Sequence, residues 1–421
     1  MNPASREPVT GAIGPTSSRV ATIPFVGLAI FTFFAVSQRW PLAEVGILVA
    51  LLGLALRTRE LRFPAPFWWG VAFLVWGLLT SFFAMSPELA RETLIERLKS
   101  MIIFFAVMNA LQTEKQLRLY LLLVLGAFMI YPARGALLNY VHGDTLFGRA
   151  IWNKTYANPN DLAALALLTI GAALAIVTRK SERMSVRWGV ASCAVGLLTV
   201  VLLTQSRGAF LGLVIGFGPP LLARVMKRPS LVVYVLIAGG IAANFVPDTV
   251  WHRLAGISKL TSTETVAQAD PEGSAAQRLE VQKTAWRVFV GHPVLGVGLG
   301  CYPQANALYS PVLGYRDTHD TYLNLAAELG VPGLLLWLAL VTSVLRHVRR
   351  CRRSIAADAL SIGTVWIQRA IIGYLVAGLF GSYSGLTLFY LILGALWCAA
   401  TLSSSVRTAA AAERAATTGK L

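Results

Sequence analysis

The chain has 421 residues, of which 56% are hydrophobic and only 14% are charged, and its formal net charge is +17. This composition and a mean hydropathy of +0.62 exclude the soluble globular classes. The apolar stretches are too long and too numerous for one buried core. They predict an all-α polytopic membrane protein with a helical polar insert.

Twelve apolar segments follow one another as expected membrane spans. A polar tail (1–19) precedes them, and no small-residue pattern follows the first span, so we expect no cleaved signal peptide. Nine spans occupy 20–246, a polar insert that ends in a catalytic helix occupies 247–330, three spans occupy 331–403, and 404–421 form a second tail. The expected spans are 20–37, 41–56, 66–85, 98–112, 117–139, 160–178, 188–204, 208–225, 231–246, 331–346, 364–380 and 386–403.

Lysine and arginine gather in alternate connections of this expected bundle. This positive-inside pattern places both termini in the cytoplasm and the insert on the outer face. Contact with anionic lipids of the bilayer accounts for these cations, so the net charge does not require nucleic acid. The inner cations are Arg57, Arg59, Arg62, Lys115, Arg118, Arg179, Lys180, Arg183, Arg187, Arg224, Lys227, Arg228, Arg346, Arg349, Arg350, Arg352 and Arg353.

An amphipathic stretch precedes the fourth expected span. Between Ser86 and Ser100, leucine and isoleucine alternate with glutamate and arginine. This pattern is typical of a helix that lies in the interface plane of a bilayer. We therefore expect a separate outer interfacial helix here, which gates the entry of lipid.

The insert contains two predicted helices and a glycine loop between them. Ser274 is expected to cap a helix that runs to about Val290. The run Gly296, Gly298 and Gly300 lacks the strand and helix that flank a phosphate-binding loop, so it predicts a tight turn against the membrane surface. A short helix is expected from about His319 to Leu329, broken by Gly330 and Pro332.

Four cationic or titratable residues lie near the outer face of the predicted bundle. Arg134 and Arg207 lie at or near span ends, and Arg278 and His319 lie in the insert. A cation kept beside lipid usually marks a site, so the group predicts a pocket for an anionic substrate group. The alternatives are a snorkelling anchor for Arg207 or Arg134, a solvated helix residue for Arg278 and a structural hydrogen bond for His319.

The order of several motifs resembles a known family, the O-antigen ligase and O-antigen polymerase superfamily. The resemblance extends from about residue 60 to 400. It rests on His319-Asp320 followed by Glu328-Leu329-Gly330-Val331-Pro332-Gly333, on Ser206-Arg207-Gly208-Ala209, on Asn158-Pro159-Asn160, and on the series Arg278, Trp286, His292-Pro293 and Gly296-Val297-Gly298.

This resemblance implies a glycosyltransferase of the bacterial inner membrane with a GT-C-like architecture and a periplasmic active site. Such enzymes take a glycan from undecaprenyl pyrophosphate and need neither a metal nor another cofactor. An O-antigen ligase passes the glycan to the lipid A-core oligosaccharide, and the motif His-Asp-x-Tyr-Leu favours this function. The alternatives within the class are an O-antigen polymerase and a protein O-oligosaccharyltransferase.

The residue types support this chemistry. Outer carboxylates are scattered singly, without the paired aspartates that hold a metal, and guanidinium groups can bind a diphosphate in its place. Arg207 and Arg278 are therefore expected to bind the donor, with Arg134 as a third candidate. His319 is the expected general base of an inverting displacement. A protonated His319 that clamps pyrophosphate is the alternative.

The remaining candidates are supporting residues. Asp320 or Glu328 is expected to orient His319 or tune its basicity. However, residues nine apart on a regular helix project to opposite sides, so Glu328 is expected to hold the break at Gly330 or to bond another span. Asn158 and Asn160 are expected to cap and start the sixth span, with substrate binding as the alternative.

A transporter or flippase of a lipid-linked glycan is the rival from another class. Such a protein places its charges near the bilayer midplane and is often built from repeated halves. Here the charges gather near the outer face, and no repeat is evident. The sequence therefore favours the transferase.

Overall fold

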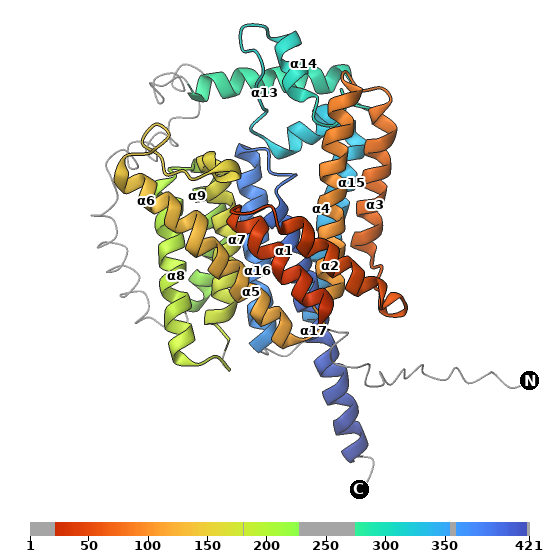
Figure 1. Ribbon diagram of the computed structural model, residues 1–421, viewed down its shortest axis with the longest axis vertical. Helices are drawn as coiled ribbons and strands as arrows, with labels where there is room; N and C mark the ends of the chain where they lie inside the picture. Colours follow the sequence, from red (N-terminus) through yellow and green to blue (C-terminus); the bar gives the residue numbers. More distant parts are fainter. Residues whose placement is uncertain (1–21, 180, 227–273, 354–358, 419–421) are drawn as a thin grey trace, which may run out of the picture.

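The computed structural model describes residues 22–179, 181–226, 274–353 and 359–418 (Figure 1). Within these ranges all regular secondary structure is helical, apart from one isolated bridge between Leu146 and Arg149. The helices form an upright bundle, and α13 (Ser274–Gly291) and α14 (Tyr302–Tyr309) lie across one end of it, called the insert end below. The all-α prediction is confirmed for the part of the chain that is described.

The bundle helices follow most of the expected spans. Six described helical runs are long and apolar enough to cross a membrane, and four shorter apolar helices accompany them. The expected ninth span (231–246) lies outside the described residues, so the total of twelve stays a prediction. The helices are α1 (Ile23–Ser37), α2 (Ala43–Ala55), α3 (Ala65–Ser81), α4 (Pro87–Ala110), α5 (Glu114–Phe128), α6 (Arg134–His142), α7 (Pro159–Val177), α8 (Met184–Leu203), α9 (Arg207–Val225), α15 (Thr321–Arg353), α16 (Ala359–Ala377) and α17 (Thr387–Thr418).

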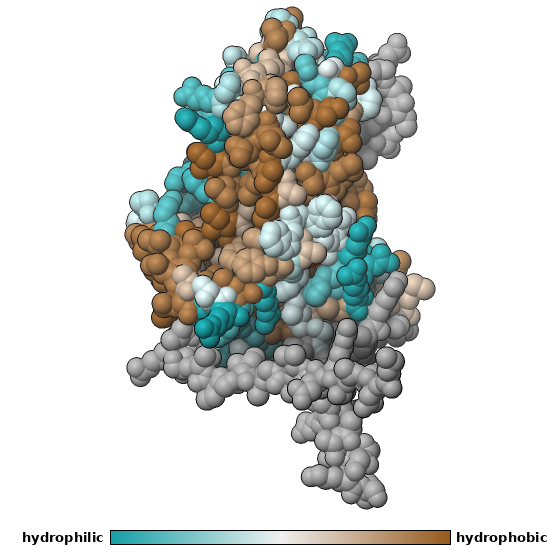
Figure 2. Space-filling model, turned by 90° about the vertical axis from the view of Figure 1, so that its right-hand side faces the viewer, coloured by the Kyte–Doolittle hydropathy of each residue, from teal (hydrophilic) through white to brown (hydrophobic). Residues whose placement is uncertain are grey.

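A broad apolar surface covers the middle of one face of the molecule. Figure 2 shows it on one face, between hydrophilic residues toward the insert end and toward the opposite end. Large apolar side chains such as Trp68 on α3 and Leu48 on α2 are more than half exposed. A soluble protein rarely exposes a continuous apolar surface, whereas a helix bundle in lipid requires one.

Small residues let several helix pairs approach closely. A Cβ added to Gly27 of α1 would lie 2.3 Å from the backbone nitrogen of Ala50 on α2. A Cβ added to Gly212 of α9 would lie 2.3 Å from the carbonyl oxygen of Gly373 on α16. Such small-residue contacts are a common way for helices to associate in lipid, where the hydrophobic effect does not drive their packing.

The amphipathic stretch before the fourth span is not a separate helix, which corrects the prediction. Residues Pro87–Ala110 form the single continuous helix α4, which runs beside α3 in Figure 1. Ser86 caps it by accepting a hydrogen bond from the backbone N–H of Leu89. The alternating charges reflect a helix with one packed side, because Ala90 is buried whereas Arg91 and Glu92 are exposed.

Two interruptions shape the remaining helices. A π-helical turn (Met129–Ala133) that contains Pro132 joins α5 to α6. In α15, Gly330 adopts φ 67° and ψ −173°, which divides the helix into a short segment before Gly330 and a long span after it. The predicted break is therefore confirmed, as is the predicted helix from Ser274.

The glycine loop connects α13 to α14 and packs against the short segment of α15. Gly296, Gly298 and Gly300 all have positive φ angles. The backbone N–H groups of Val297 and Gly298 donate to the carbonyls of Ala327 and Glu328, both at 3.0 Å. A Cβ on Gly296 would lie 2.2 Å from the backbone of Glu328. The predicted tight turn is confirmed, and its N–H groups serve its packing on α15. Its place against the membrane surface stays a prediction.

Candidate functional site

A cavity of about 530 Å³ lies at the insert end. Four segments far apart in the sequence line it: the turn 146–149, the start of α7 with the residues before it, the first described turns of α13, and the loop before α15. Its volume is in the range of ligand-binding clefts. Arg149, Arg278, Arg316 and His319 all line this cavity.

His319 lies two residues before α15 in a left-handed conformation with φ 53°. Residues other than glycine are uncommon in this region, although histidine adopts it more readily than most, and the surrounding contacts hold the backbone there. The hydroxyl of Thr318 donates to the carbonyl of Asp320 at 3.0 Å and lies 2.9 Å from the hydroxyl of Ser382. These bonds fix the backbone on both sides of the imidazole.

The segment after α16 holds the same loop from the other side. Ser382 donates from its hydroxyl to Oδ1 of Asp317 at 2.9 Å. Thr321 donates to the carbonyl of Gly381 at 2.6 Å and accepts from the N–H of Tyr383 at 2.9 Å. The loop that carries His319 is therefore held in place by the segment between α16 and α17 as well as by α15.

The electrostatic surroundings of His319 favour a neutral ring. Burial lowers the pKa of His319, and the cations Arg278 and Arg316 lower it further, whereas Asp317 opposes them. A lowered pKa leaves the imidazole deprotonated near neutral pH, where it can accept a proton. This charge state suits a general base better than a cationic phosphate clamp.

Asp320 caps the helix that follows His319. Its Oδ1 accepts hydrogen bonds from the backbone N–H groups of Tyr322 at 2.9 Å and Leu323 at 3.0 Å. Burial raises the pKa of Asp320, and these two N–H groups act against that rise. The capping accounts for the presence of this carboxyl, and its role in orienting His319 stays a prediction.

Arg149 is a cavity residue that the sequence reasoning missed. Its side chain is only 8% exposed. Nε donates to the carbonyl of Thr204 at 2.7 Å, and Nη2 donates to Oδ1 of Asn160 at 2.7 Å. Two neutral oxygens therefore fix the orientation of this guanidinium. Its sequence signal is weak, because Arg149 belongs to no recognised motif and the only hint is a cation in an outer loop otherwise poor in them.

Asn158 and Asn160 begin α7 and face the same cavity. The side chain of Asn158 accepts from the backbone N–H of Asn160 at 2.9 Å, which confirms the predicted cap. Because Asn160 in turn accepts from Arg149, the helix start also positions a cation. The two asparagines thus cap the helix and line the cavity at once.

Arg278 lies one turn before the packed stripe of its helix and on the same face, because residues three and seven apart on a helix project to one side. Val281, Ala285 and Val288 are buried and form a cluster with residues of the glycine loop, α14 and α15. This apolar stripe seats α13 on the bundle, and Gln277, Arg278 and Val281 then line the cavity. Arg316, the second cation that the sequence reasoning missed, reaches the cavity from the exposed loop before His319.

Three predicted residues lie elsewhere. Arg134 is exposed at the start of α6, and Arg207 is half-buried at the start of α9. Neither of them lines the cavity, although Arg207 lies three residues after Thr204, which Arg149 contacts. Glu328 is 4% exposed and accepts from the N–H of Tyr302 at 3.4 Å, away from His319 as its spacing predicted. Donor binding by Arg134 and Arg207 stays a prediction.

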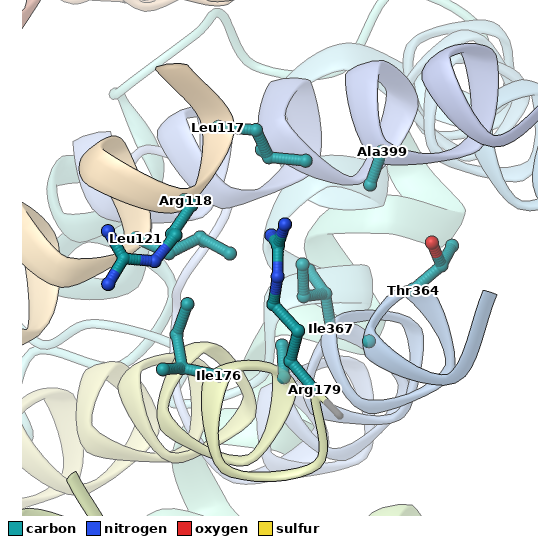
Figure 3. A pocket seen from close by; sticks show the side chains of 10 residues that line it. Leu117, Arg118, Leu121, Ile176, Arg179, Thr364, Ile367 and Ala399 are labelled. Carbon is teal, nitrogen blue, oxygen red and sulfur yellow. The ribbon is translucent and has the colours of Figure 1, made fainter. Parts of the chain in front are cut away.

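A second pocket lies at the other end of α7 (Figure 3). Its volume is only about 20 Å³, enough for about one water molecule. Arg118 and Arg179 line it, and both form ion pairs, Arg118 with Glu182 and Arg179 with Glu114 at 2.6 Å. These pairs tie α5 to the α7–α8 connection, which is a structural role.

Comparisons with known proteins point to one family. Residues 192–338 match the family model of the O-antigen ligase. The chain is also 23% identical over 300 residues to a Rickettsia felis protein named "Putative polysaccharide ligase", which covers 67% of this chain and 68% of the relative. The matched range contains Arg207, Arg278 and His319, whereas Arg149 and Asn158 precede it. The resemblance of the motifs is therefore confirmed: residues 192–338 match an O-antigen ligase domain, and this match together with the apolar helices supports a membrane protein of ligase type.

Proposed function

We propose that this protein transfers a glycan from undecaprenyl pyrophosphate to the lipid A-core oligosaccharide at the periplasmic face of the inner membrane. One observation carries the proposal: Arg149, Arg278, Arg316 and His319 line a single cavity at the insert end. The positive-inside pattern supports a periplasmic location for that end. The ligase family supports the glycan and the acceptor.

The arginines stabilise the leaving group. When the bond from the sugar to pyrophosphate breaks, negative charge grows on the phosphate oxygens. A guanidinium binds two such oxygens at once and stays charged at any working pH. Arg149 is already oriented by Thr204 and Asn160, so little reorganisation is needed when the donor binds. Arg207 and Arg134 are proposed as further donor-binding residues outside the cavity lining.

His319 acts on the acceptor. An acceptor hydroxyl attacks the anomeric carbon as the bond from that carbon to the pyrophosphate oxygen breaks. The hydroxyl proton passes to the imidazole of His319, whose lowered pKa keeps it free to accept one. The products are the glycosylated acceptor and the lipid pyrophosphate, and the anomeric configuration inverts. Asp320 caps the helix that follows this residue, Glu328 holds the start of α14, and no metal takes part.

Reconstitution tests the proposal. The purified chain in proteoliposomes receives an undecaprenyl-pyrophosphate glycan and rough lipopolysaccharide, with and without a chelator. We expect slower-migrating lipopolysaccharide bands in both conditions, and none with the His319→Ala variant. Longer lipid-linked glycans would indicate a polymerase, a glycosylated protein would indicate a protein transferase, and movement of the donor without a new bond would indicate a flippase.

A further inference from the structure

The turn that carries Arg149 has an unfavourable residue at its tip. Leu146 and Arg149 exchange two backbone hydrogen bonds of 3.1 Å, and between them Phe147 has φ 52° and Gly148 has φ 70°. Two successive left-handed residues define the type I′ geometry, in which asparagine, aspartate and glycine are favoured. Phenylalanine is a poor choice for the first of these positions.

The surroundings impose this conformation. The N–H of Ala150 donates to the carbonyl of Leu203 at 3.0 Å, and the amide of Gln205 donates to the carbonyl of Gly148 at 3.1 Å. Arg149 adds its bond to Thr204. The turn is thus pinned to the α8–α9 connection, so that Phe147 is held at a fixed place. Strain that a fold maintains in this way is often part of a functional site.

The ring of Phe147 does not serve the core. It is 74% exposed and belongs to neither buried apolar cluster of the described chain. Instead, Phe147 and Leu146 form an apolar part of the cavity wall. They precede Arg149, which also lines the cavity, by two and three residues in the sequence. One rigid turn therefore offers an anion-binding group and an apolar surface side by side. This combination matches a ligand whose phosphates continue into a hydrocarbon chain.

We infer that Phe147, together with Leu146, binds the first isoprenoid units of the donor lipid while the diphosphate lies against the arginines. The inference rests on the proposed function. The new element is the assignment of the residues that recognise the isoprenoid tail of the donor. The charge at the inner side of the turn and the apolar ring at its tip fix the direction in which the donor lies.

Two donors that differ only in the tail test this assignment. They carry the same pyrophosphate-linked glycan on a full-length polyprenyl chain or on a short, water-soluble isoprenoid. The Phe147→Asn variant suits the turn better and removes the apolar ring. We expect unchanged or higher thermal stability, and a rise of about tenfold in the ratio of KM for the long-tail donor to KM for the short-tail donor. Phe147→Leu is expected to restore most of the wild-type ratio.

Val141 provides a matched control. It is 79% exposed on the neighbouring α6 but does not line the cavity. If exposed apolar residues here only anchor the protein in lipid, Val141→Asn and Phe147→Asn will change the ratio alike, and the inference is wrong. It is also wrong if Phe147→Asn leaves the ratio unchanged or raises both KM values equally. Failure of the wild-type protein to transfer the glycan from either donor would instead contradict the proposed function.

Discussion

Both ends of helix α7 border a pocket lined by arginine, and the two pockets differ in almost every other respect. At the insert end the cavity measures about 530 Å³ and contains Arg149, Arg278 and Arg316. At the opposite end about 20 Å³ remain between Arg118 and Arg179. The arginine side chains of the small pocket are bound by the carboxylates of Glu182 and Glu114. The charges of those guanidinium groups are therefore paired within the protein.

The difference lies in what holds each guanidinium. Two of the hydrogen bonds that orient Arg149 go to a carbonyl and an amide oxygen, which direct the group without adding a negative charge. The bonds of Arg118 go to a carboxylate that is itself nearly buried. An arginine oriented by neutral oxygens keeps its attraction for an anionic ligand, whereas one paired with a carboxylate is largely satisfied. Arginine content alone therefore does not identify the site.

The largest expected effect belongs to His319. Replacement by alanine removes the proton acceptor, and loss of a general base typically lowers kcat by about 10²- to 10⁴-fold. Transfer to lipopolysaccharide in proteoliposomes measures the loss, and the thermal unfolding temperature checks that the variant is folded. Because the backbone at His319 has positive φ, His319→Asn is a control that suits the conformation and lacks the base. Activity within threefold of wild type in either variant would contradict the mechanism.

Arg278 ranks next. We expect Arg278→Ala to lower kcat/KM by about 100-fold, because a charged hydrogen-bonding group at the leaving phosphates contributes about 2 to 3 kcal/mol. Arg278→Lys keeps the charge but loses the bidentate geometry, so its kcat/KM should lie between those of wild type and Arg278→Ala. The measurement is the initial rate against donor concentration. If kcat/KM of Arg278→Ala equals that of wild type, Arg278 does not bind the donor. The comparison between the two pockets would then rest on Arg149 and Arg316.

The pH profile sharpens the role of the cavity charges. Because the pKa of His319 is lowered by burial and by nearby cations, the base stays deprotonated into mildly acidic solution. We expect kcat/KM to fall only as the pH drops below about 6.5, the ordinary value for histidine. Arg316→Gln removes one of those cations and should move the acidic limb to higher pH. A rate that instead falls as the pH rises through this range would assign His319 the cationic, phosphate-binding role.

The elements of the fold were largely predictable because their signals are local. The break at Gly330, the helix from Ser274 and the cap at Asn158 each follow from residues adjacent in sequence. The amphipathic stretch from Ser86 was misjudged, since its charge pattern is the same for an interfacial helix and for the exposed side of a packed one. Only the contacts of α4 with its neighbours distinguish the two.

The site was predictable only in part. Arg278 and His319 belong to motifs, and both line the cavity. Arg149 and Arg316 do not. Their place depends on how the turn 146–149 packs on the α8–α9 connection and on how the segment between α16 and α17 holds the loop before α15. Such long-range contacts leave no pattern in a single sequence. Arg207 illustrates the converse, because it has a motif but lies outside the cavity lining.

The smallest effect on transfer is expected at the opposite end of α7. Arg118→Ala leaves the nearly buried carboxylate of Glu182 without its main partner, which should lower the free energy of unfolding by about 1 to 3 kcal/mol. The transfer rate at a temperature well below unfolding should stay within about twofold of wild type. Adding Glu182→Gln removes the stranded charge and should recover part of the lost stability. If Arg118→Ala instead abolished transfer in a folded protein, the paired arginines would share in the function, and the distinction between neutral and carboxylate partners would fail as a guide to the site.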